Sequence, residues 1–549
     1  MIRRFLKILL FLNFVLTLQV AAREEVYLVP DRTNCVSGDT IWFSTFIFNP
    51  QESYRQNVVH VQLDKLSGAH ITKVSIACNG SSGTGYLVVP DSLSTGIYVL
   101  KAFTNIQKDT ESTVVHQRLI SVYNRFETEI GRITFPDTEG KQFEKPEGIE
   151  VRSGPRSVVG SRQLNFDIEI SDELRENLEQ LFVIARLADP VSENFSQMWI
   201  DGQLSDESSS FMPVREQNGV LVTGKIYSPI DGSPAKGAVV LLSISDTLPY
   251  LDYCVADDMG RFYFYVRDAY GPGNLVVQEF TDQAQKNKIE LFENYIETGA
   301  LKTADKIFTP DERSYAEDMI KAAYFKRFFQ GYSALASDSF SLYKSFPNPF
   351  YGPPTRSYYP ELFIDLPNFQ EVSREILHGV QYRERRDDVS IRLLDEGTQT
   401  IFKDEPFKLL DGIPVFNPGI FTDMGTTEIK KVDVVFFKRF YGDLNFDGVM
   451  AVYRHQPSLS WIELAEGVEL FRYPCLQQQK EWNFRNKNQT TEITPDFKKV
   501  LFREKWNHIP SQKSISFDAS DIEGDIVFEI IGVSKNHNLL QYHRVVETK

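Results

Sequence analysis

The segments LLDGIPV (residues 409–415) and EIKKVDVVFFKRFYGDLNFDGVMAVY (428–453) carry the most specific structural signals in this sequence. In the first segment, Gly412 allows a backbone conformation that other residues resist, and Pro414 restricts the chain, so a tight turn is expected between two strands. In the second segment, large apolar side chains recur at every second position from 432 to 436, which is typical of a strand. Together they predict part of a small mixed sheet with helices.

These two segments are preceded by a short helix expected at 367–378 and a hairpin expected at 380–395. The whole arrangement, over 367–455, resembles the plug domain of TonB-dependent outer-membrane transporters. The residues that carry the resemblance are Asp411, Gly412, Pro414, Tyr441, Gly442 and Gly448. The resemblance implies a plug-like α/β domain at this place in the chain.

The chain departs from the transporter pattern after this plug-like domain. In that family a barrel follows the plug in the same chain, and such barrels can need about 22 strands of about ten residues each. Residues 454–549 are too few for that number of strands. We therefore expect either a module reused as a building block, or a plug-like domain that docks on a barrel formed by another chain.

The first 22 residues are predicted to be a cleavable signal peptide. A positive start is followed by an apolar run and by small residues at 20–22. The alternative is an uncleaved anchor, although the apolar run is short for a bilayer. Removing the signal takes three positive charges from the formal net charge of −16 and leaves −19. An acidic exported chain is not expected to bind nucleic acid, and we expect it in the periplasm or at the outer membrane, with peripheral rather than integral association.

Residues 23–125 are predicted to form a β-sandwich. The runs TIWFSTFIF (40–48), VVHVQLDK (58–65) and GIYVLKAFT (96–104) are β-branched and aromatic, and turn residues separate them. The stretches DRTNCVSGDTIWF and YLVVPDSLSTGIYVLKAFTN resemble the beginning and end of a macroglobulin-type domain. Cys35 and Cys78 lie in this domain and are candidates for a disulfide in an oxidising compartment, but their spacing alone does not decide the pairing.

Three further sandwiches are expected from alternating strands. One is predicted at 145–215 and another at 218–299, where the sequence resembles a carboxypeptidase regulatory-like or transthyretin-like domain without chemistry of its own. The third is predicted at 456–549, on the pattern of residues 512–534. The fold class that follows is mainly β and multidomain, with tandem immunoglobulin-like sandwiches and one small α/β domain.

Residues 300–366 are predicted to connect these domains through a helix and an aromatic, Pro-rich stretch. Thr309, Pro310 and Glu312 have the pattern of a capping box at a helix start. Ala316, Met319, Ile320 and Ala323 then repeat at helical spacing. The aromatic stretch either covers a core or forms an exposed docking surface, and the candidates for that surface are Phe346, Phe350, Tyr351, Tyr358 and Tyr359.

The residues do not predict an enzyme, a metal site or a cofactor. The segment DLNFDG (443–448) matches the first half of a calcium loop, but the twelfth position is Arg454 instead of a bidentate acid. Cys475 begins a Cys-x-x-Gln pattern that lacks the Gly and Glu of a macroglobulin thioester. The sequence contains no zinc-binding His spacing and no nucleophile elbow.

The function expected from these patterns is a non-catalytic scaffold of the cell envelope that binds protein partners, such as an outer-membrane barrel or an assembly or uptake complex. One alternative is a ligand-binding accessory of a TonB-dependent uptake system, for which a pocket lined by convergent polar groups would be evidence. The other is an exported hydrolase, for which a cleft joining perturbed acidic residues or histidines would be evidence.

Overall fold

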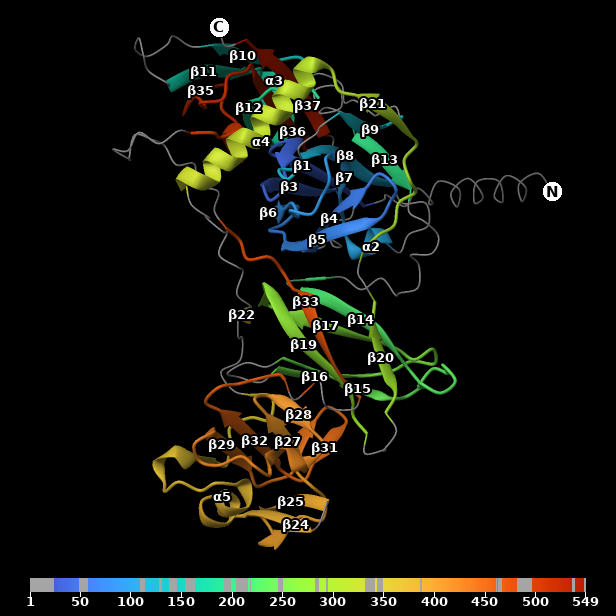
Figure 1. Ribbon diagram of the computed structural model, residues 1–549, viewed down its shortest axis with the longest axis vertical. Helices are drawn as coiled ribbons and strands as arrows, with labels where there is room; N and C mark the ends of the chain where they lie inside the picture. Colours follow the sequence, from blue (N-terminus) through green and yellow to red (C-terminus); the bar gives the residue numbers. More distant parts are fainter. Residues whose placement is uncertain are drawn as a thin grey trace, which may run out of the picture. The chain divides into compact units, whose positions relative to one another are not determined.

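The computed structural model describes most of the chain (Figure 1). The described residues are 24–48, 58–108, 114–127, 131–137, 146–153, 163–191, 199–203, 216–217, 219–244, 250–281, 286–292, 295–330, 341–342, 349–385, 388–460, 462, 467–480, 496–535 and 539–547. The expected signal peptide and Phe346 lie outside them. Within the described part, no helix has the length and apolar character needed to cross a membrane.

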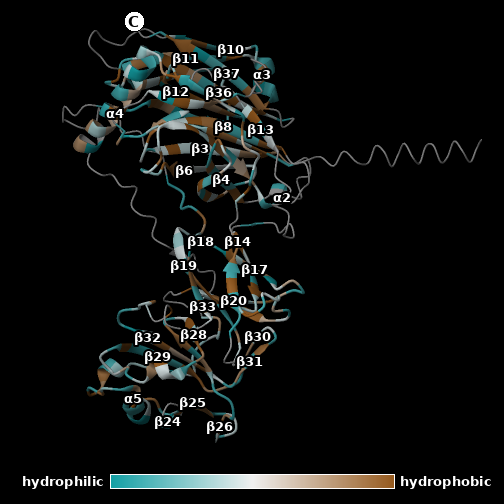
Figure 2. Ribbon diagram, turned by 45° about the vertical axis from the view of Figure 1, so that its right-hand side comes forward, coloured by the Kyte–Doolittle hydropathy of each residue, from teal (hydrophilic) through white to brown (hydrophobic). Residues whose placement is uncertain are grey.

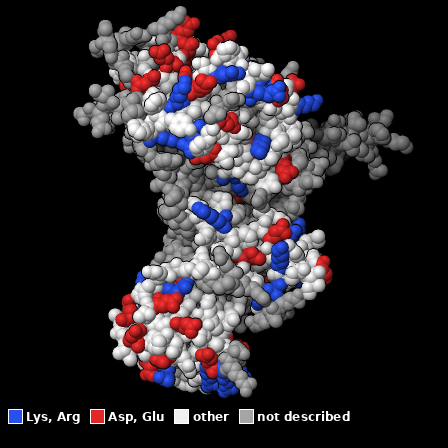
Figure 3. Space-filling model, in the orientation of Figure 1, with Lys and Arg blue, Asp and Glu red and all other residues white. Residues whose placement is uncertain are grey.

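The chain divides into two compact units, each assembled from separate segments. The first unit is Met1–Asn218, Tyr295–Asp338 and Leu476–Lys549, and the second unit is Gly219–Asn294 and Ser339–Cys475. Both units are built mainly from strands, which confirms the expected mainly β, multidomain fold class. On the face shown in Figure 3, acidic and basic side chains are interspersed over each unit.

The first sandwich lies in the first unit and contains the strands expected at 40–48, 58–65 and 96–104, together with one strand from the region expected to form the second sandwich. One sheet has the order β1-β3-β6, and the other has the order β13-β8-β7-β4-β5, with β2 paired to β8. These strands are β1 (Glu25–Pro30), β2 (Asn34–Val36), β3 (Thr40–Phe48), β4 (Val58–Lys65), β5 (His70–Ala77), β6 (Ser82–Val88), β7 (Gly96–Phe103), β8 (Val114–Tyr123) and β13 (Trp199–Gln203). A short helix, α2 (Asn105–Lys108), follows β7.

The second sandwich joins strands from two distant parts of the chain. Its sheets have the orders β10-β11-β35 and β34-β12-β36-β37. The elements are β10 (Ile149–Ser153), β11 (Gln163–Ile170), α3 (Asp172–Asn177), β12 (Leu178–Leu187), β34 (Val500–Trp506), β35 (Gln512–Asp518), β36 (Ile526–Ser534) and β37 (Leu539–Val546). Residues 500–546 therefore do not form the separate C-terminal sandwich expected from their pattern. Their apolar faces are buried against β11 and β12 instead, as in the ring contact of Phe166 with Phe528 at 4.7 Å.

The first and second sandwiches pack against each other through apolar and charged side chains. The rings of Phe46 and Phe182, one from each sandwich, lie 4.9 Å apart in a buried cluster. Beside this cluster, the buried Arg118 guanidinium lies 3.1 Å from the Glu529 carboxylate and over the ring of Trp199. The apolar contacts and this buried ion pair fix the two sandwiches as one body within the first unit.

Helix α4 (Pro310–Gln330) packs on the first sandwich and begins at the predicted capping box. Thr309 N donates to Glu312 Oε2 at 2.9 Å, and Glu312 N donates to Thr309 Oγ1 at 3.2 Å, which confirms the prediction. The four residues predicted to repeat along this helix are all buried in one cluster with β2, β7 and β8. Preceding the helix, β21 (Thr303–Ile307) pairs with β9 (Arg132–Pro136).

The third sandwich lies in the second unit. Its sheets have the orders β17-β14-β20 and β16-β15-β19-β33. The strands are β14 (Gly219–Tyr227), β15 (Val239–Ile244), β16 (Tyr250–Val255), β17 (Arg261–Arg267), β19 (Pro272–Glu279), β20 (Lys288–Leu291) and β33 (Val468–Pro474). In the same unit, β18 (Ala269–Tyr270) pairs with β22 (Ser341–Leu342) in the antiparallel direction. Strand β33 comes from the region expected to form the C-terminal sandwich, and it pairs with β19 over seven residues.

A mixed five-stranded sheet completes the second unit, in the order β23-β29-β32-β27-β28. The pair β27 and β32 is parallel and the others are antiparallel. The elements of this region are β23 (Arg356–Tyr358), η3 (Pro360–Leu362), α5 (Phe369–Glu375), β24 (Val380–Arg385), β25 (Asp388–Asp395), β26 (Thr400–Ile401), β27 (Phe407–Leu410), β28 (Ile413–Val415), η4 (Pro418–Phe421), β29 (Ile429–Val435), β30 (Arg439–Tyr441), β31 (Leu444–Phe446) and β32 (Val449–Arg454).

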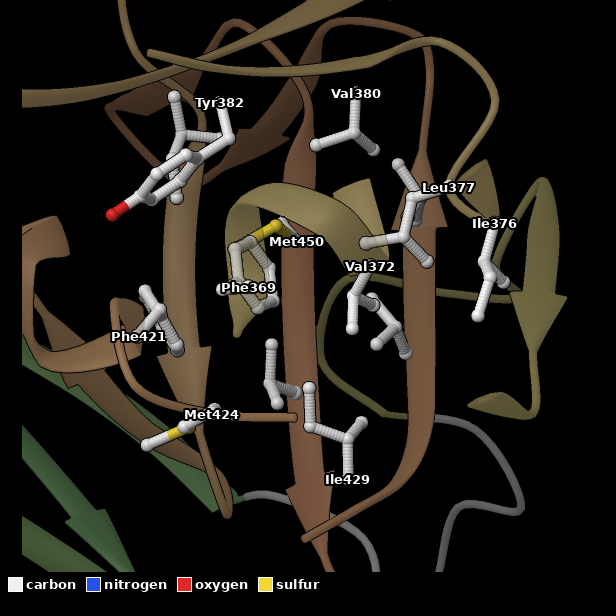
Figure 4. Packing of buried hydrophobic residues seen from close by; sticks show 14 of the residues in the cluster. Phe369, Val372, Ile376, Leu377, Val380, Tyr382, Phe421, Met424, Ile429 and Met450 are labelled. Atoms are coloured by element: carbon white, nitrogen blue, oxygen red, sulfur yellow. The ribbon is translucent and has the colours of Figure 1, made fainter. Parts of the chain in front are cut away.

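Both faces of the mixed sheet are covered within the second unit. On one face, α5 and the hairpin β24–β25 bring Phe369, Val372 and Tyr382 against Met450 and Ile429 (Figure 4). On the other face, residues of β27, β29 and β32 pack against β15 and β16 of the third sandwich. Because both faces of the sheet are buried, the strands β27, β29 and β32 carry apolar residues on both sides. Figure 2 shows hydrophobic colour along these strands.

Candidate binding sites

The turn between β27 and β28 is held by Asp411 and Gly412, the first two residues of the plug-like motif. Both have positive φ, 49° for Asp411 and 87° for Gly412. The Asp411 carboxylate accepts hydrogen bonds from Arg454 N at 2.8 Å and from Arg454 Nε at 2.7 Å. Arg454, which fails the calcium pattern, therefore has a structural role as the partner of this carboxylate.

Gly448, immediately before β32, is required by close backbone packing. Its φ is 88°, and an added Cβ would lie 2.6 Å from the carbonyl oxygen of Val435. Only glycine fits such an approach without displacing the neighbouring strand.

Pro414, Tyr441 and Gly442 attach the mixed sheet to the third sandwich. The Pro414 carbonyl accepts a hydrogen bond from Gln278 Nε2 at 3.1 Å. Tyr441 Oη donates to the Leu251 carbonyl at 2.6 Å, and a Cβ on Gly442 would lie 2.0 Å from Tyr253 Oη. Half of the motif residues thus serve an internal contact of the second unit. The sequence carried no signal of this role, because the partner strands lie far away in the chain.

The aromatic stretch at 349–358 is anchored on the mixed sheet through Tyr351. Its ring is buried, and its hydroxyl lies 2.9 Å from Tyr453 Oη and 3.4 Å from Asp433 Oδ2. Burial raises the pKa of Tyr351 well above its ordinary value and raises the pKa of Tyr453 to about 12, so both side chains remain neutral hydrogen-bonding groups. Ser357 Oγ donates to the other oxygen of Asp433 at 2.6 Å.

An aromatic pocket of about 270 Å³ opens beside this anchor. It is lined by Phe350, Tyr351, Gly352, Pro353, Arg439, Phe440, Tyr441 and Phe446. Phe440 is 74% exposed at its border. Among the described residues, the buried Nε of Arg439 has no hydrogen-bond partner. The pocket therefore offers apolar ring surfaces and one cationic donor, the Arg439 Nε–H, that no described residue satisfies.

The five aromatic residues expected to form a docking surface have different environments. Tyr351 is core, Phe350 lines the aromatic pocket, and Tyr358 donates to the His378 carbonyl at 2.8 Å. Tyr359 is exposed, and Phe346 lies outside the described residues.

A more exposed apolar stretch lies at 362–364; its first two residues end the aromatic stretch predicted at 345–363, but none of the three was a candidate for the docking surface. Leu362 is 77% exposed, Ile364 is 74% exposed, and Phe363 between them is also exposed. The run of three large apolar residues, LFI, could have identified this segment from the sequence. Such a run is usually buried in a core, and where it is exposed it often belongs to a functional surface.

A polar pocket of about 490 Å³ lies in the first unit, where the first and second sandwiches meet. It is lined by Asn79, Ser82, Gly83, Thr84, Glu179, Gln180, Gln479, Lys505 and Asn507. Lys505 Nζ donates to Ser82 Oγ at 2.9 Å across this junction. No sequence pattern indicated the pocket, because its residues come from four separate stretches of chain.

His60 takes part in a buried hydrogen-bond relay that has the residue types of a hydrolytic triad. Ser75 Oγ lies 2.8 Å from His60 Nδ1, and Glu216 Oε2 lies 2.6 Å from His60 Nε2. All three residues are buried, which favours a structural role that ties the segment at 216–217 to strand β4. A nucleophile would need access to substrate.

Cys35 and Cys78 are both buried in the first sandwich and are free thiols in the structure. They have different partners: Cys35 Sγ contacts the Ser121 carbonyl at 3.6 Å, and Cys78 Sγ lies 3.8 Å from Thr45 Oγ1. Burial raises the pKa of each thiol to about 12. The structure therefore does not form the disulfide considered for this pair, because each thiol is held by its own neighbour.

No family model matches this sequence, and no curated protein matches it. Solved structures with weak similarity include trypsin-activated alpha-2-macroglobulin from Escherichia coli, with 8% identity over 96% of this chain and 42% of that chain, at a TM-score of 0.21. The D0-D1 domain of intimin has 11% identity over 49% of this chain and 99% of that chain, at a TM-score of 0.14. A tetra-tandem repeat of a large adhesion protein has 9% identity over 96% of this chain and all of that chain, at 0.13.

These likenesses are too weak to assign a family or an activity, and the chain spans less than half of the macroglobulin's length. The class of the protein follows from its own structure. It is a multidomain, mainly β protein with immunoglobulin-like sandwiches and one mixed α/β domain.

Proposed function

We propose that this protein is a non-catalytic scaffold of the cell envelope that binds protein partners through the aromatic pocket of the mixed-sheet domain. The observation that carries the proposal is the pocket's lining: an exposed Phe440, buried rings, and the buried Nε of Arg439, which has no hydrogen-bond partner among the described residues. Aromatic residues and arginine are enriched where protein interfaces bind most tightly. A volume of about 270 Å³ is suited to one large side chain of a partner.

The proposed occupant is an aromatic or aliphatic side chain of the partner, with an acidic group nearby. The rings of Phe350 and Tyr441, 5.4 Å apart, supply an apolar wall. The guanidinium of Arg439 supplies donors for a carboxylate, which an arginine binds with two parallel hydrogen bonds. Burying an arginine nitrogen without a partner is costly, so a bound carboxylate would relieve that cost.

The plug resemblance supports an outer-membrane partner and bears on how the domain would dock. Because both faces of the mixed sheet are covered within the second unit, docking on a barrel of another chain would use the rim of the domain. The exposed stretch at 362–364 and Phe440 are the apolar parts of that rim. Export by a signal peptide and association with the outer membrane remain part of this proposal.

A photo-crosslinking amino acid at position 440 of the full chain, expressed in intact envelopes, tests the proposal. We expect crosslinks to one envelope protein, identified by mass spectrometry, and their loss when Arg439→Ala is added. The matched control is the same crosslinker at Ile230, which is 76% exposed on the third sandwich of the same unit. Equal yields at both positions, or hydrolytic activity of the purified protein, would overturn the proposal.

A second candidate function is a ligand-binding accessory of a TonB-dependent uptake system. The polar pocket of the first unit favours it, because its amides, hydroxyls and charges converge on one space. Binding of a small molecule to the purified full chain would support this candidate, and the ligand class is considered next.

A further inference from the structure

We infer that the polar pocket of the first unit is a binding site for a neutral, hydroxyl-rich ligand, a saccharide. The inference goes beyond protein binding by the aromatic pocket and deepens the second candidate function. It rests on the composition of the pocket, on an unsatisfied acceptor in its wall, and on the way the pocket is built.

The side chains in the pocket match the chemistry of sugar hydroxyls. Amides such as those of Gln180 and Asn507 present a donor and an acceptor together, and so does the hydroxyl of Thr84. A sugar hydroxyl also donates and accepts, so it can satisfy both halves of each group. An apolar ligand would leave most of these groups unpaired.

The charges of the pocket favour a neutral ligand over an ion. Its two charged residues, Glu179 and Lys505, have opposite sign. Lys505 is already engaged, because its ammonium donates to Ser82 Oγ at 2.9 Å and lies over the Phe182 ring at 5.6 Å. An anion would meet Glu179 and a cation would meet Lys505, whereas a neutral polyol meets neither penalty.

Gln180 supplies an independent observation that points to a ligand. Its Oε1 is buried and, among the described residues, accepts no hydrogen bond. Buried polar atoms in native proteins are nearly always paired, and each exception calls for an explanation. A ligand hydroxyl that donates to this oxygen would provide one.

The pocket is formed by elements that do not depend on a ligand for their position. Its walls come from β6, from the beginning of β12 and from the end of β34, and the residues Asn79, Gln479 and Asn507 beside these strands complete them. These strands belong to two sandwiches that are fixed by the buried cluster around Phe46 and Phe182. A volume of about 490 Å³ falls in the range of small-molecule sites and exceeds what a single inorganic ion fills.

The test measures binding of three named probes, maltose, cellobiose and N-acetylglucosamine, to the full chain by saturation-transfer NMR and calorimetry. We expect at least one probe to bind with a dissociation constant of about 1 mM or tighter. Gln180→Leu and Asn507→Ala should each weaken that binding by roughly tenfold, which corresponds to the loss of about one good hydrogen bond.

Three controls make the outcome decisive. Gln381→Leu changes a partly exposed glutamine on β24, in the second unit, and should bind as the wild type does. Asn507 is exposed, so its variant should fold even if Gln180→Leu does not. Sodium phosphate at the same concentration should not compete. Absence of binding by all three probes at about ten times the expected constant, competition by phosphate, or unchanged binding in the foldable variants would overturn the inference.

The test also separates this inference from the proposed scaffold function. Phe440→Ala should leave saccharide binding unchanged, and Gln180→Leu should leave crosslinking at position 440 unchanged. In the wild-type chain, saccharide binding without a specific crosslink at position 440 would overturn only the scaffold proposal, and the crosslink without saccharide binding would overturn only this inference.

Discussion

Replacing Gly442 by alanine should loosen the contact between the mixed sheet and the third sandwich. Gly442 has a φ of 59°, and an added Cβ would lie 2.0 Å from Tyr253 Oη. A left-handed backbone costs a residue with a Cβ about 1–2 kcal/mol. Displacing Tyr253 would also break its hydrogen bond from Asp443 N, at 2.9 Å, which contributes about 1 kcal/mol. The free energy of local opening should therefore fall by about 2–3 kcal/mol.

Hydrogen exchange of the full chain, read by mass spectrometry, measures this change where it occurs. Peptides that cover β16 and the pair β30–β31 should exchange roughly 30- to 150-fold faster in Gly442→Ala, since each 1.4 kcal/mol is about a factor of ten. Peptides from the first sandwich should exchange as in the wild type. A local measurement is preferable to global unfolding here, because a chain with several domains need not unfold in one transition.

Two variants separate the steric contact from backbone strain. Gly232→Ala has a similar φ of 71° with no atom within 4 Å of the added Cβ, so it should lose only the backbone contribution. Tyr253→Ala removes the hydroxyl and the two ring carbons that the new Cβ would meet at 2.0, 2.9 and 3.0 Å, and Gly442→Ala in that background should cost about 1–2 kcal/mol. The reasoning is refuted if Gly442→Ala costs the same with and without the Tyr253 side chain.

Three further predictions concern the first unit. Burial alone would raise the pKa of Glu312, but hydrogen bonds from Lys306 and from the backbone of Thr309 lower it overall. The ionised Glu312 carboxylate therefore stabilises α4 at a pH above its unfolded pKa, and this stabilisation is lost as the pH falls through its folded pKa. Glu312→Gln should lower the stability of α4 by about 1 kcal/mol at neutral pH and should weaken the acid-side pH dependence of amide hydrogen exchange in α4. Arg118→Met should lower the free energy of unfolding of the first unit by about 3–5 kcal/mol in urea titrations, because it leaves the Glu529 charge buried without its ionic partner. The double variant Arg118→Met, Glu529→Met should recover part of this loss. The buried thiols of Cys35 and Cys78, with pKa values of about 12, should react with Ellman's reagent at pH 8 far more slowly in the native protein than in urea. A protein mass 2 Da lower before reduction than after it, together with a disulfide-linked Cys35–Cys78 peptide, would contradict this prediction.

Local patterns in the sequence predicted local structure well. The strand expected at 40–48 is β3, with the same bounds, and the capping box at Thr309 forms with both of its hydrogen bonds. These features depend only on residues within a few positions of each other, so a short window of sequence is enough to predict their geometry.

Long-range pairing could not be predicted in the same way. The alternation in residues 512–518 identifies a strand, β35, but not its partner, and that partner is β11 rather than a neighbour in sequence. The apolar face of one strand can be buried against any apolar face of matching shape, so the choice of its partner depends on all the strands of the fold.

The candidate sites show the same limit. Phe350 and Tyr351 were recognised because aromatic residues gathered in one stretch, and they do line or support the aromatic pocket. Gln180 and Asn507 belong to a site that exists only after two sandwiches have packed together. Nothing in the residues next to either one distinguishes it from an ordinary surface amide.

The order in which the chain is made gives the second sandwich a particular history. Strand β12 is synthesised more than 300 residues before β36, which pairs along almost its entire length. During synthesis, β11 and β12 remain without their partners β35, β34 and β36 until the second unit has been made. The C-terminal strands therefore complete the second sandwich last, and a chain that ends before them would expose unpaired strand edges to proteases and chaperones.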